Sequence, residues 1–550
     1  MISLTLRTWL TFFGLAILMG LNNIYSTLLT GWGEGGSIVA VILSLLFLAK
    51  NERTIFNYNL GQTMASAGGS VGFAVSIIAS IYYLHPHWDP PLFQLSIMVM
   101  GLSVMGVAFA APLRRTIVHW FFPSAVACAT ILKAVTSEND GERKRARNLM
   151  GISGLVSALL TIPTKAAIKP GGSTLWHAIP LPAGLSISLD PLLYGIGIVV
   201  GPRIGISMLI GGLLNFFLFT PYMAESAADF SRWAAVGLMT LPAFTSVLFA
   251  LFMKKHGQLP PGFTPKENGS KMTTKDWASI GLIFTLALAA TVWGMDSVFQ
   301  VSYPYVALAA GIAAPLCFTL GKVASETDIN PVRLLAIILL LIFSLTGNFG
   351  AVALLGVGIA GAAMAAIAVD LFYDLRTGYL INADPKQQVI VQFLAVIPVS
   401  FAAVFFLHML AENFGFGEGK YFPAPGAIVW ASMAELFAEG TSQISSLIWK
   451  TVIYTSIIGV FMTLIENSKK FQHYALSPFA IGIAFLMPID VSCAICLGSF
   501  IRYGFISLSS TPHQAKEEAF QAGSAIFAAS ALAGIIAVIL ISMGILYLPE

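Results

Sequence analysis

The feature that most constrains this chain is the recurrence, from one end to the other, of apolar segments long enough to span a bilayer. Hydrophobic residues make up 57% of the 550 residues, charged residues only 10%, and the mean hydropathy is +0.82. Soluble domains carry roughly 25% charged residues, so there is too little charge here to cover a soluble surface. A barrel would show short alternating strands instead. The sequence therefore predicts an all-α polytopic membrane protein.

The longest strongly polar stretch lies near the middle, at "KKHGQLPPGFTPKENGSKMTTKDW". We expect it to join two membrane parts, which gives an N-terminal repeat over 1–255, a linker over 256–277 and a C-terminal part over 278–550. The apolar segments fall at 7–30, 33–49, 61–84, 92–113, 116–136, 148–168, 187–219 and 233–253 in the first part, and at 278–294, 303–320, 331–346, 349–373, 387–410, 422–439, 446–465, 476–505 and 520–547 in the second.

The two parts share short sequence matches. "LDPLLYGIGIVVGPRIGISMLIGG" (189–212) aligns without gaps with "LSPFAIGIAFLMPIDVSCAICLGS" (476–499), at an offset of 287 residues. "FFPSAVA" (121–127) matches "YFPAPGA" (421–427) at an offset of 300. Matches in the same order with nearly equal offsets indicate a duplicated unit. We therefore expect two repeats of about eight apolar segments each.

The positions of basic residues predict the topology. The net charge is only +3 and the basic residues lie in short loops, which favours topology signals over nucleic-acid binding. Arg114, Arg115 and the "KRAR" cluster at 144–147 then lie in the cytoplasm, as does the N-terminus. Because segment 116–136 has basic residues at both ends, we expect it to be re-entrant. When the same assignment of sides is followed along the chain, segment 187–219 must begin and end on the same side of the membrane. It therefore forms a helical hairpin with its tip at Gly201-Pro202-Arg203.

One additional span at 278–294 inverts the second part relative to the first. Segment 422–439 then becomes the matching re-entrant element, and 476–505 the matching hairpin. Two inverted repeats with paired re-entrant segments and hairpins are typical of secondary transporters. A row of ordinary spans is the alternative arrangement.

Several stretches resemble the oligopeptide transporter (OPT) family, which includes the yellow-stripe-like metal–chelate transporters. The block at 374–392 is similar to the family's Asp-x-Lys-Thr-Gly-Tyr-Leu…Pro-x-x-Gln motif, with Arg376 in place of lysine. The segment at 121–134 resembles its Phe-Pro-Ser segment, although Ala125-Val126 replaces the frequent Gly-Thr. The quoted stretches are "LTLRTWLTFFGLAILMGLNNIYSTLLTG", "GQTMASAGGSVGFAV", "FFPSAVACATILKA", "DLRTGYLINADPKQQVIVQ" and "FPAPGAIVWASMAELFAEG".

The resemblance spans nearly the whole chain in the right order. It implies proton-coupled import of short peptides, glutathione-like compounds or metal chelates, with no cofactor besides the coupling proton. It also implies a bacterial inner-membrane protein, and we expect a homodimer. Neither a P-loop nor a spaced Ser/His/Asp set is present, which disfavours ATP-driven transport and hydrolysis. An intramembrane enzyme acting on a lipid-linked substrate and a passive channel are the alternative functions.

The two hairpins carry ionisable residues in apolar surroundings, where such residues are functional candidates. Arg203 aligns with Asp490. A guanidinium binds a substrate carboxylate through paired hydrogen bonds, whereas a carboxylate binds a substrate amine or the coupling proton. Asp190 precedes Pro191, which favours a helix N-cap. We expect substrate to lie between 116–136, 422–439 and the two hairpins.

Further candidates lie on other segments. Asp370 is set a helical turn deeper than Asp374, and Glu435 and Glu439 share one face of 422–439, so both pairs are candidates for proton coupling. An interfacial anchor and an exposed amphipathic face are the respective alternatives. Thr63, Ser66 and Ser70 lie in a small-residue stretch that serves packing or a polar path, and the resemblance adds Tyr379 and Gln392 as substrate contacts. In "HPHWD" (85–89), a proline-rich turn is favoured over a metal site.

Overall fold

The computed structural model describes residues 4–31, 48, 52–120, 122–136, 140–170, 173–174, 178–223, 226–252, 273–327, 332–439, 446–468 and 475–548. Within these ranges the protein is almost entirely helical, and eleven helices are long and apolar enough to cross a membrane. The predicted class, an all-α polytopic membrane protein, is confirmed. Most of segment 33–49 and linker residues 256–272 lie outside the described residues.

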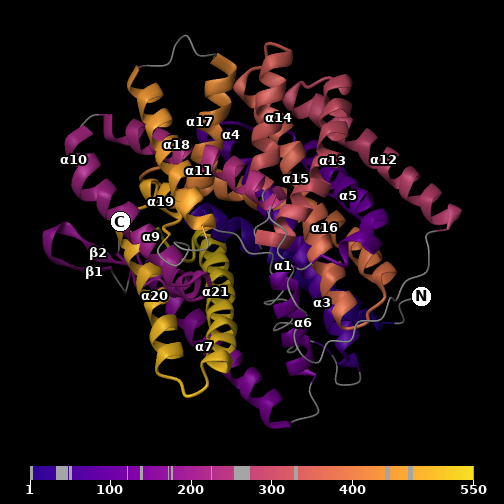
Figure 1. Ribbon diagram of the computed structural model, residues 1–550, viewed down its shortest axis with the longest axis horizontal. Helices are drawn as coiled ribbons and strands as arrows, with labels where there is room; N and C mark the ends of the chain where they lie inside the picture. The colour runs from indigo at the N-terminus through magenta and orange to yellow at the C-terminus, as the bar shows by residue number, and fades with distance from the viewer. Residues whose placement is uncertain are drawn as a thin grey trace.

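The helices form two packing groups, which lie beside each other in Figure 1. The first, here called the core group, is built around α15 (Ala351–Leu380). Its other members are α1 (Leu6–Thr30), α3 (Ile55–Ser76), α4 (Ala79–Leu84), α5 (Leu92–Ile117), α6 (Pro123–Val135), α12 (Thr274–Phe299), α13 (Tyr303–Thr327), α14 (Val332–Thr346), α16 (Pro385–Phe414) and α17 (Pro425–Glu439).

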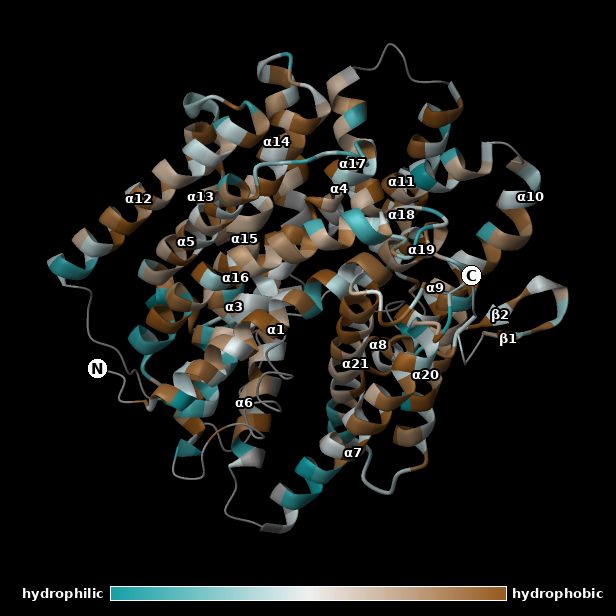
Figure 2. Ribbon diagram, turned by 180° about the vertical axis from the view of Figure 1, so that it is seen from behind, coloured by the Kyte–Doolittle hydropathy of each residue, from teal (hydrophilic) through white to brown (hydrophobic). Residues whose placement is uncertain are grey.

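Helix α15 lies in the centre of the core group because its own residues are small and apolar on every side. It packs on α3, α5, α13 and α14, and nearly every residue from Leu354 to Asp374 is buried. A helix that is apolar all round belongs in the interior of a bundle. The brown ribbons in the middle of Figure 2 show this apolar interior.

Glycines allow α3 to pack closely on α1. A side chain at Gly68 or Gly72 would meet the backbone of α1 at Ala16 or Gly20, respectively. Such small-residue contacts are the usual way in which membrane helices approach each other. The "ASAGGS" stretch therefore serves packing on one face of α3, and the opposite faces remain available for its polar residues.

The second group, here called the hairpin group, contains both hairpins. Its members are α7 (Asp140–Lys165), α8 (Pro191–Val200), α9 (Pro202–Leu214), the π-helical turn η3 (Asn215–Phe219), α10 (Thr220–Met223), α11 (Ala227–Phe252), α18 (Ser446–Asn467), α19 (Pro478–Phe485), α20 (Ile489–Ser507) and α21 (Pro512–Ser542). A short excursion before α8 pairs β1 (Ile179–Pro180) antiparallel with β2 (Ser186–Ile187), around the 3-10 turn η2 (Pro182–Gly184).

The chain reverses direction between α8 and α9. Gly201 has a φ of 81°, a conformation that favours glycine, and Pro202 begins α9. Ser188, just before α8, bonds to Asp490, and Tyr194 of α8 packs on Gly498, whereas on α9 Gly205 packs on Ser499 and Gly212 on Ser492. Helix α8 therefore runs parallel to α20 and α9 runs back. The expected hairpin with its tip at Gly201-Pro202 is present.

The second hairpin breaks between Phe485 and Ile489. Ser477 caps α19, and its backbone N–H donates to the Ser207 hydroxyl at 2.9 Å. Since α19 runs parallel to α9 and α20 runs antiparallel to it, the two hairpins point in opposite directions. Each tip lies beside the open end of the other hairpin.

The predicted re-entrant segments form short helices. Helix α6 has 13 residues and α17 has 15, and at ~1.5 Å per residue both are shorter than a ~30 Å hydrocarbon core. Both pack on α15. Helix α12 begins at Thr274, inside the predicted linker, because Thr273 and Asp276 form a capping box.

Candidate functional site

A buried polar cluster, here called the polar core, lies where α3, α15 and α16 meet. Its residues are Gln62, Thr63 and Ser66 from α3, Asp370 and Asp374 from α15, and Gln388 and Gln392 from α16. The two aspartates are four residues apart and therefore share one face of α15. Five of the candidates from sequence come together here: Thr63, Ser66, Asp370, Asp374 and Gln392.

Neutral groups supply the hydrogen bonds to the two carboxylates. The Ser66 hydroxyl donates to Asp370 Oδ1 at 2.6 Å, and Gln392 Nε2 lies 3.5 Å from Asp370 Oδ2. The Gln62 amide donates to Asp374 Oδ1. Gln388 Nε2 donates to the backbone carbonyl of Asp374 at 2.7 Å. Ser70, one turn beyond Ser66, is buried on the same face of α3.

No cationic partner is found for either carboxylate among the described residues. Asp374 is 0% exposed and Asp370 is 5% exposed, yet the ion pairs within the described part of the chain include neither. Asp374 Oδ2 and Gln392 Oε1 are buried without a hydrogen bond. Burying a charge is very unfavourable unless it is paired. This arrangement favours uptake of a proton or another small cation.

The remainder of the 374–392 block holds the end of α5 and the start of α6 against α15. The Arg376 guanidinium donates to the carbonyl of Val118, and the Thr377 hydroxyl donates to the carbonyl of Ala125 at 3.3 Å. Tyr379 is half-buried, with its ring 5.6 Å from the Arg376 guanidinium and 5.6 Å from the His119 ring. Tyr379 therefore lies at the edge of the polar core and not within it.

Sequence reasoning missed Gln62 and Gln388, although both stand inside the stretches that carry the family resemblance. A glutamine in an apolar helix needs partners, and this signal alone could have marked them. The connection between them could not be read from the chain, because Gln62 and Asp374 are 312 residues apart.

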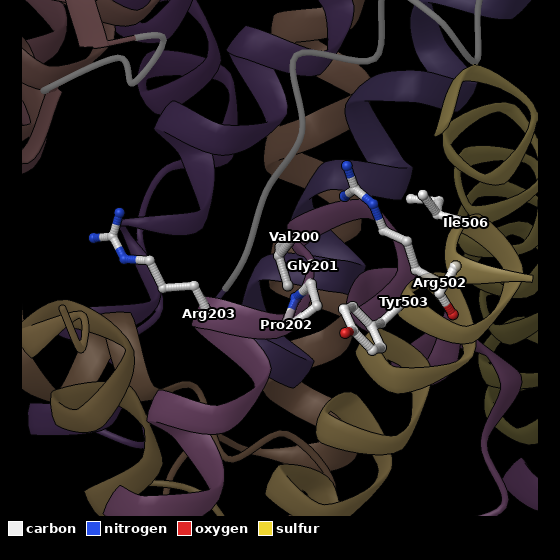
Figure 3. Close-up of a pocket in the computed structure, with 8 residues that line it drawn as sticks. Val200, Gly201, Pro202, Arg203, Arg502, Tyr503 and Ile506 are labelled. Atoms are coloured by element: carbon white, nitrogen blue, oxygen red, sulfur yellow. The ribbon is translucent and has the colours of Figure 1, made fainter. Parts of the chain in front are cut away.

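Arg203 lies at the tip of the first hairpin, beside a pocket of about 320 Å³ lined by Gly201, Pro202, Arg502 and Tyr503. Figure 3 shows the Arg203 side chain extending away from Arg502. Its guanidinium pairs with Glu466 and donates from Nε to the carbonyl of Ala475 at 3.0 Å. Arg203 is thus half-buried and engaged by α18 and the start of the second hairpin.

A buried ion pair joins α7 to the first hairpin. Asp190 caps α8 by accepting from Leu192 N–H at 3.0 Å, which confirms the expected N-cap. Its other oxygen lies 2.5 Å from Lys165 Nζ. Asp490 lies in the first turn of α20, where its backbone carbonyl accepts from the Ser188 N–H at 3.4 Å.

Glu435 lies at the boundary between the two groups. Its carboxylate is 3.9 Å from Arg232 of α11, and it is half-exposed. Glu439 ends α17, and its side chain lies outside the described residues. Helices α6 and α17 pack on α15, whereas both hairpins pack on one another and on α11 or α21. The four segments expected around the substrate thus belong to different packing groups.

Among the described residues, no three His, Cys, Asp or Glu side chains form a metal-binding cluster. The polar core therefore offers oxygen ligands from two carboxylates and neutral side chains. Such a set suits a proton or a hard cation better than a transition metal.

Comparison with known proteins gives the family. Residues 3–541 match the model of the OPT oligopeptide transporter protein family. A putative oligopeptide transporter of Haemophilus influenzae is 24% identical over 87% of this chain and 85% of its own length. A probable metal-nicotianamine transporter of Oryza sativa is 22% identical over 76% of this chain and 67% of its own.

An iron-phytosiderophore transporter of Oryza sativa is 25% identical, over 45% of this chain and 37% of its own length. The relatives are named as transporters and not as enzymes, so the catalytic alternative falls away. Together with the membrane-spanning helices, the match over nearly the whole length shows that this chain belongs to the OPT oligopeptide transporter family and is a multi-pass membrane transporter.

Proposed function

We propose that this protein is a proton-coupled secondary transporter that imports short peptides, glutathione-like compounds or metal chelates. The observation that carries the proposal is the polar core, in which Asp370 and Asp374 are buried with neutral hydrogen-bond donors only. Intramembrane carboxylates of this kind mark proton relays in transporters. A proton bound here would remove the energetic penalty of burial, and its release would drive a rearrangement.

The proposal divides proton coupling between the two aspartates and the residues that hold them. Asp370 and Asp374 share the coupling proton across one helical turn. Ser66 and Gln392 hold Asp370 by donating to it, and Thr63 holds Gln388, whose amide lies 3.3 Å from its hydroxyl. Ser70 continues the polar face of α3. Glu435, and Glu439 beyond it, would serve a proton or cation at the group boundary.

The substrate class follows from two lines of support. The relatives' names include oligopeptide, metal-nicotianamine and iron-phytosiderophore transport, and the chelators of such metals, like peptides, present carboxylates and amines. Arg203 would bind a substrate carboxylate after releasing Glu466, and Asp490 would bind an amine. Tyr379 would contact substrate at the edge of the polar core, and Gln392 would contact it from within the core.

The transport cycle would use the internal symmetry of the chain. Contacts recur in equivalent pairs: α7 packs on α21 as α18 packs on α11, and α8 packs on α20 as α19 packs on α9. This supports two inverted repeats, one over 1–255 and the other within 278–550 after the linking span, an arrangement typical of secondary transporters. We place the N-terminus in the cytoplasm, the protein in a bacterial inner membrane, and the functional unit as a homodimer.

The test uses purified protein in proteoliposomes with an inward proton gradient. Uptake of a labelled tetrapeptide, glutathione and a ferric chelate is compared with and without a protonophore. We expect at least one substrate to accumulate above its external concentration and to leak out when the protonophore is added. Equilibration that ignores the proton gradient would identify a passive channel, and no uptake of any class would contradict the proposed substrates.

A further inference from the structure

The two hairpins hold each other's tips through side chains at equivalent positions. Arg502 of α20 donates from Nη1 to the carbonyls of Ile198 at 3.1 Å and Val199 at 2.7 Å, where α8 ends. Asn215, which lies 287 residues earlier, donates from Nδ2 to the carbonyl of Phe485 at 3.0 Å, where α19 ends. Carbonyls at a helix end need outside donors, and inside a bilayer no water supplies them. Each hairpin therefore satisfies the break in the other.

A second pair of contacts repeats at the same offset of 287 residues. Arg203 donates from Nε to the carbonyl of Ala475 at 3.0 Å, while the backbone N–H of Ser188 donates to the carbonyl of Asp490 at 3.4 Å. Arg203 is equivalent to Asp490, and Ala475 to Ser188. One contact uses a side-chain donor and the other a backbone donor, but equivalent sequence positions are joined at both ends.

The glycines matched between the repeats make a third equivalent pair. A side chain at Gly211 would lie 2.9 Å from the carbonyl oxygen of Ile481, and one at Gly498 would meet the carbonyl of Tyr194. Tyr194 and Ile481 are themselves equivalent. The hairpins thus interlock backbone against backbone, with no room for side chains to slide between them.

Contacts between the hairpin group and the core group differ from the backbone contacts between the two hairpins. The Tyr421 hydroxyl lies 3.5 Å from the carbonyl of Lys165, Thr240 lies 3.7 Å from the sulfur of Met433, and Arg232 lies 3.9 Å from Glu435. Where α21 meets α1 and α3, Gly534 packs on the Tyr25 ring, and Leu15, Met19, Ala65 and Ala528 form a small apolar cluster. Each of these contacts is made by a side chain and not by backbone against backbone, so changes of rotamer allow it to form again in another register.

We propose that the two hairpins, each clamped at its tip by the open end of the other through Arg502 and Asn215, move as one rigid body against the core group, and that the α21 contact with α1 and α3 is a sliding surface. The proposal rests on the chain being a secondary transporter. Arg502 and Asn215 are positioning residues: they keep Arg203 and Asp490 at a constant separation while the whole hairpin pair changes its position beside the polar core. Packed elements move in this way because their interiors do not deform continuously.

The first experiment measures distances between paired spin labels in proteoliposomes, after Cys128, Cys317, Cys493 and Cys496 are replaced by alanine. Leu214→Cys with Ser507→Cys joins the two hairpins, and Ile390→Cys with Ser507→Cys joins the core group to a hairpin; all three positions are exposed. Distances are recorded at pH 8 and pH 5, with and without glutathione or a ferric chelate.

We expect a narrow and unchanged distance within the hairpin pair, and a change of more than about 5 Å, one helical turn, between the groups. If the hairpin–hairpin distance changes as much, the hairpins are not one body. If no condition changes the distance between the groups, there is no sliding. Because this measurement does not depend on uptake, failure of the proposed transport function would be distinguishable from failure of the rigid-body inference.

The second experiment locks each surface with an oxidised cysteine pair. Ser207→Cys with Ser477→Cys joins α9 to the second hairpin, where the native contact is 2.9 Å, and Met19→Cys with Ala528→Cys joins the groups. The first cross-link should leave uptake within about twofold and the second should abolish it, with recovery after reduction. The reverse pattern would contradict the inference.

A clamp variant adds a kinetic readout. Arg502→Gln should lower the maximal uptake rate without changing the half-saturation concentration, because substrate contacts remain while the body loosens. Arg502→Lys, which keeps a donor, should restore part of the rate. Broadening of the Leu214–Ser507 distance in Arg502→Gln is expected in parallel; an unchanged width would argue against the clamp.

Discussion

The polar core and the hairpin pair differ in what their hydrogen bonds join. In the polar core, side chains bond to side chains, and atoms such as Asp374 Oδ2 and Gln392 Oε1 are left without a partner. In the hairpin pair, side chains bond to backbone carbonyls freed by the helix breaks, as Arg502 and Asn215 do. The first region retains unsatisfied capacity for a small cation, and the second uses its capacity to stiffen a structure.

Unpaired polar atoms therefore mark one region of this transporter, and capped helix ends mark the other. Both regions bury polar groups in an apolar setting, which is unfavourable unless those groups are paired. The pairing differs between them: Asp374 keeps one buried oxygen without a hydrogen bond, whereas the carbonyls at the helix breaks are capped.

Removing the polar-core carboxylates should have the largest effect on transport. Asp374→Asn and Asp370→Asn should each lower proton-driven accumulation by about tenfold or more, because an amide cannot carry a proton in exchange. Uptake into proteoliposomes with an inward proton gradient measures this. Asp384→Asn is the matched control, since Asp384 is an exposed cap of α16; normal accumulation in Asp370→Asn and Asp374→Asn would remove the polar core from coupling.

Breaking the buried ion pair of the hairpin group should have the largest effect on stability. Lys165→Gln leaves Asp190 buried without its cation, and we expect the free energy of unfolding to fall by about 3–5 kcal/mol. Unfolding in mixed micelles measures the change. Lys386→Gln removes the exposed partner of Asp276 and should change the free energy by only about 0–1 kcal/mol. Equal effects would show that burial does not distinguish the two pairs.

Crowding the hairpin interface should be less severe. Gly498→Ala places a methyl group against the backbone of Tyr194, whose Cα would lie 2.9 Å away, and should lower the free energy of unfolding by about 1–3 kcal/mol. Gly504→Ala lies on the same helix with no atom within 4 Å and should be neutral or slightly stabilising. Thermal unfolding in detergent compares them, and a tolerated Gly498→Ala would contradict tight interlocking.

The exposed ion pair at the first hairpin tip should contribute least to stability. The Arg203 and Glu466 side chains are 39% and 29% exposed, so solvent screens their attraction. Glu466→Gln should change the free energy of unfolding by about 0–1 kcal/mol. The same thermal measurement detects it. A fall in the free energy of unfolding as large as that of Lys165→Gln would mean that solvent is excluded equally from both ion pairs.

Local signals in the sequence predicted much of the fold. Gly201-Pro202 marked the first hairpin tip because glycine accepts a positive φ and proline starts a helix. Asp190 was recognised as a cap for the same kind of local reason. The short lengths of α6 and α17 also agree with expectation. The start of α12 was missed, although Thr273 and Asp276 offered a capping box.

The candidate site was predicted only in pieces. Ser66 and Asp370 were each singled out, but nothing local joins residues that are 304 positions apart. Arg203 was considered as a substrate ligand, and only the fold shows that Glu466 and Ala475 engage it. Lys165 drew no attention, because a lysine at a helix end looks interfacial until its burial is known.

From the sequence alone it follows that this chain is a helical membrane protein, and that its first hairpin breaks at Gly201-Pro202. These properties follow from hydropathy and backbone preference, which act over one or two helical turns. Only the tertiary structure decided which carboxylates lack a cation and which hairpin clamps which. Pairing of that kind depends on helices that meet across hundreds of residues, and the energy of a buried charge depends on all its neighbours at once.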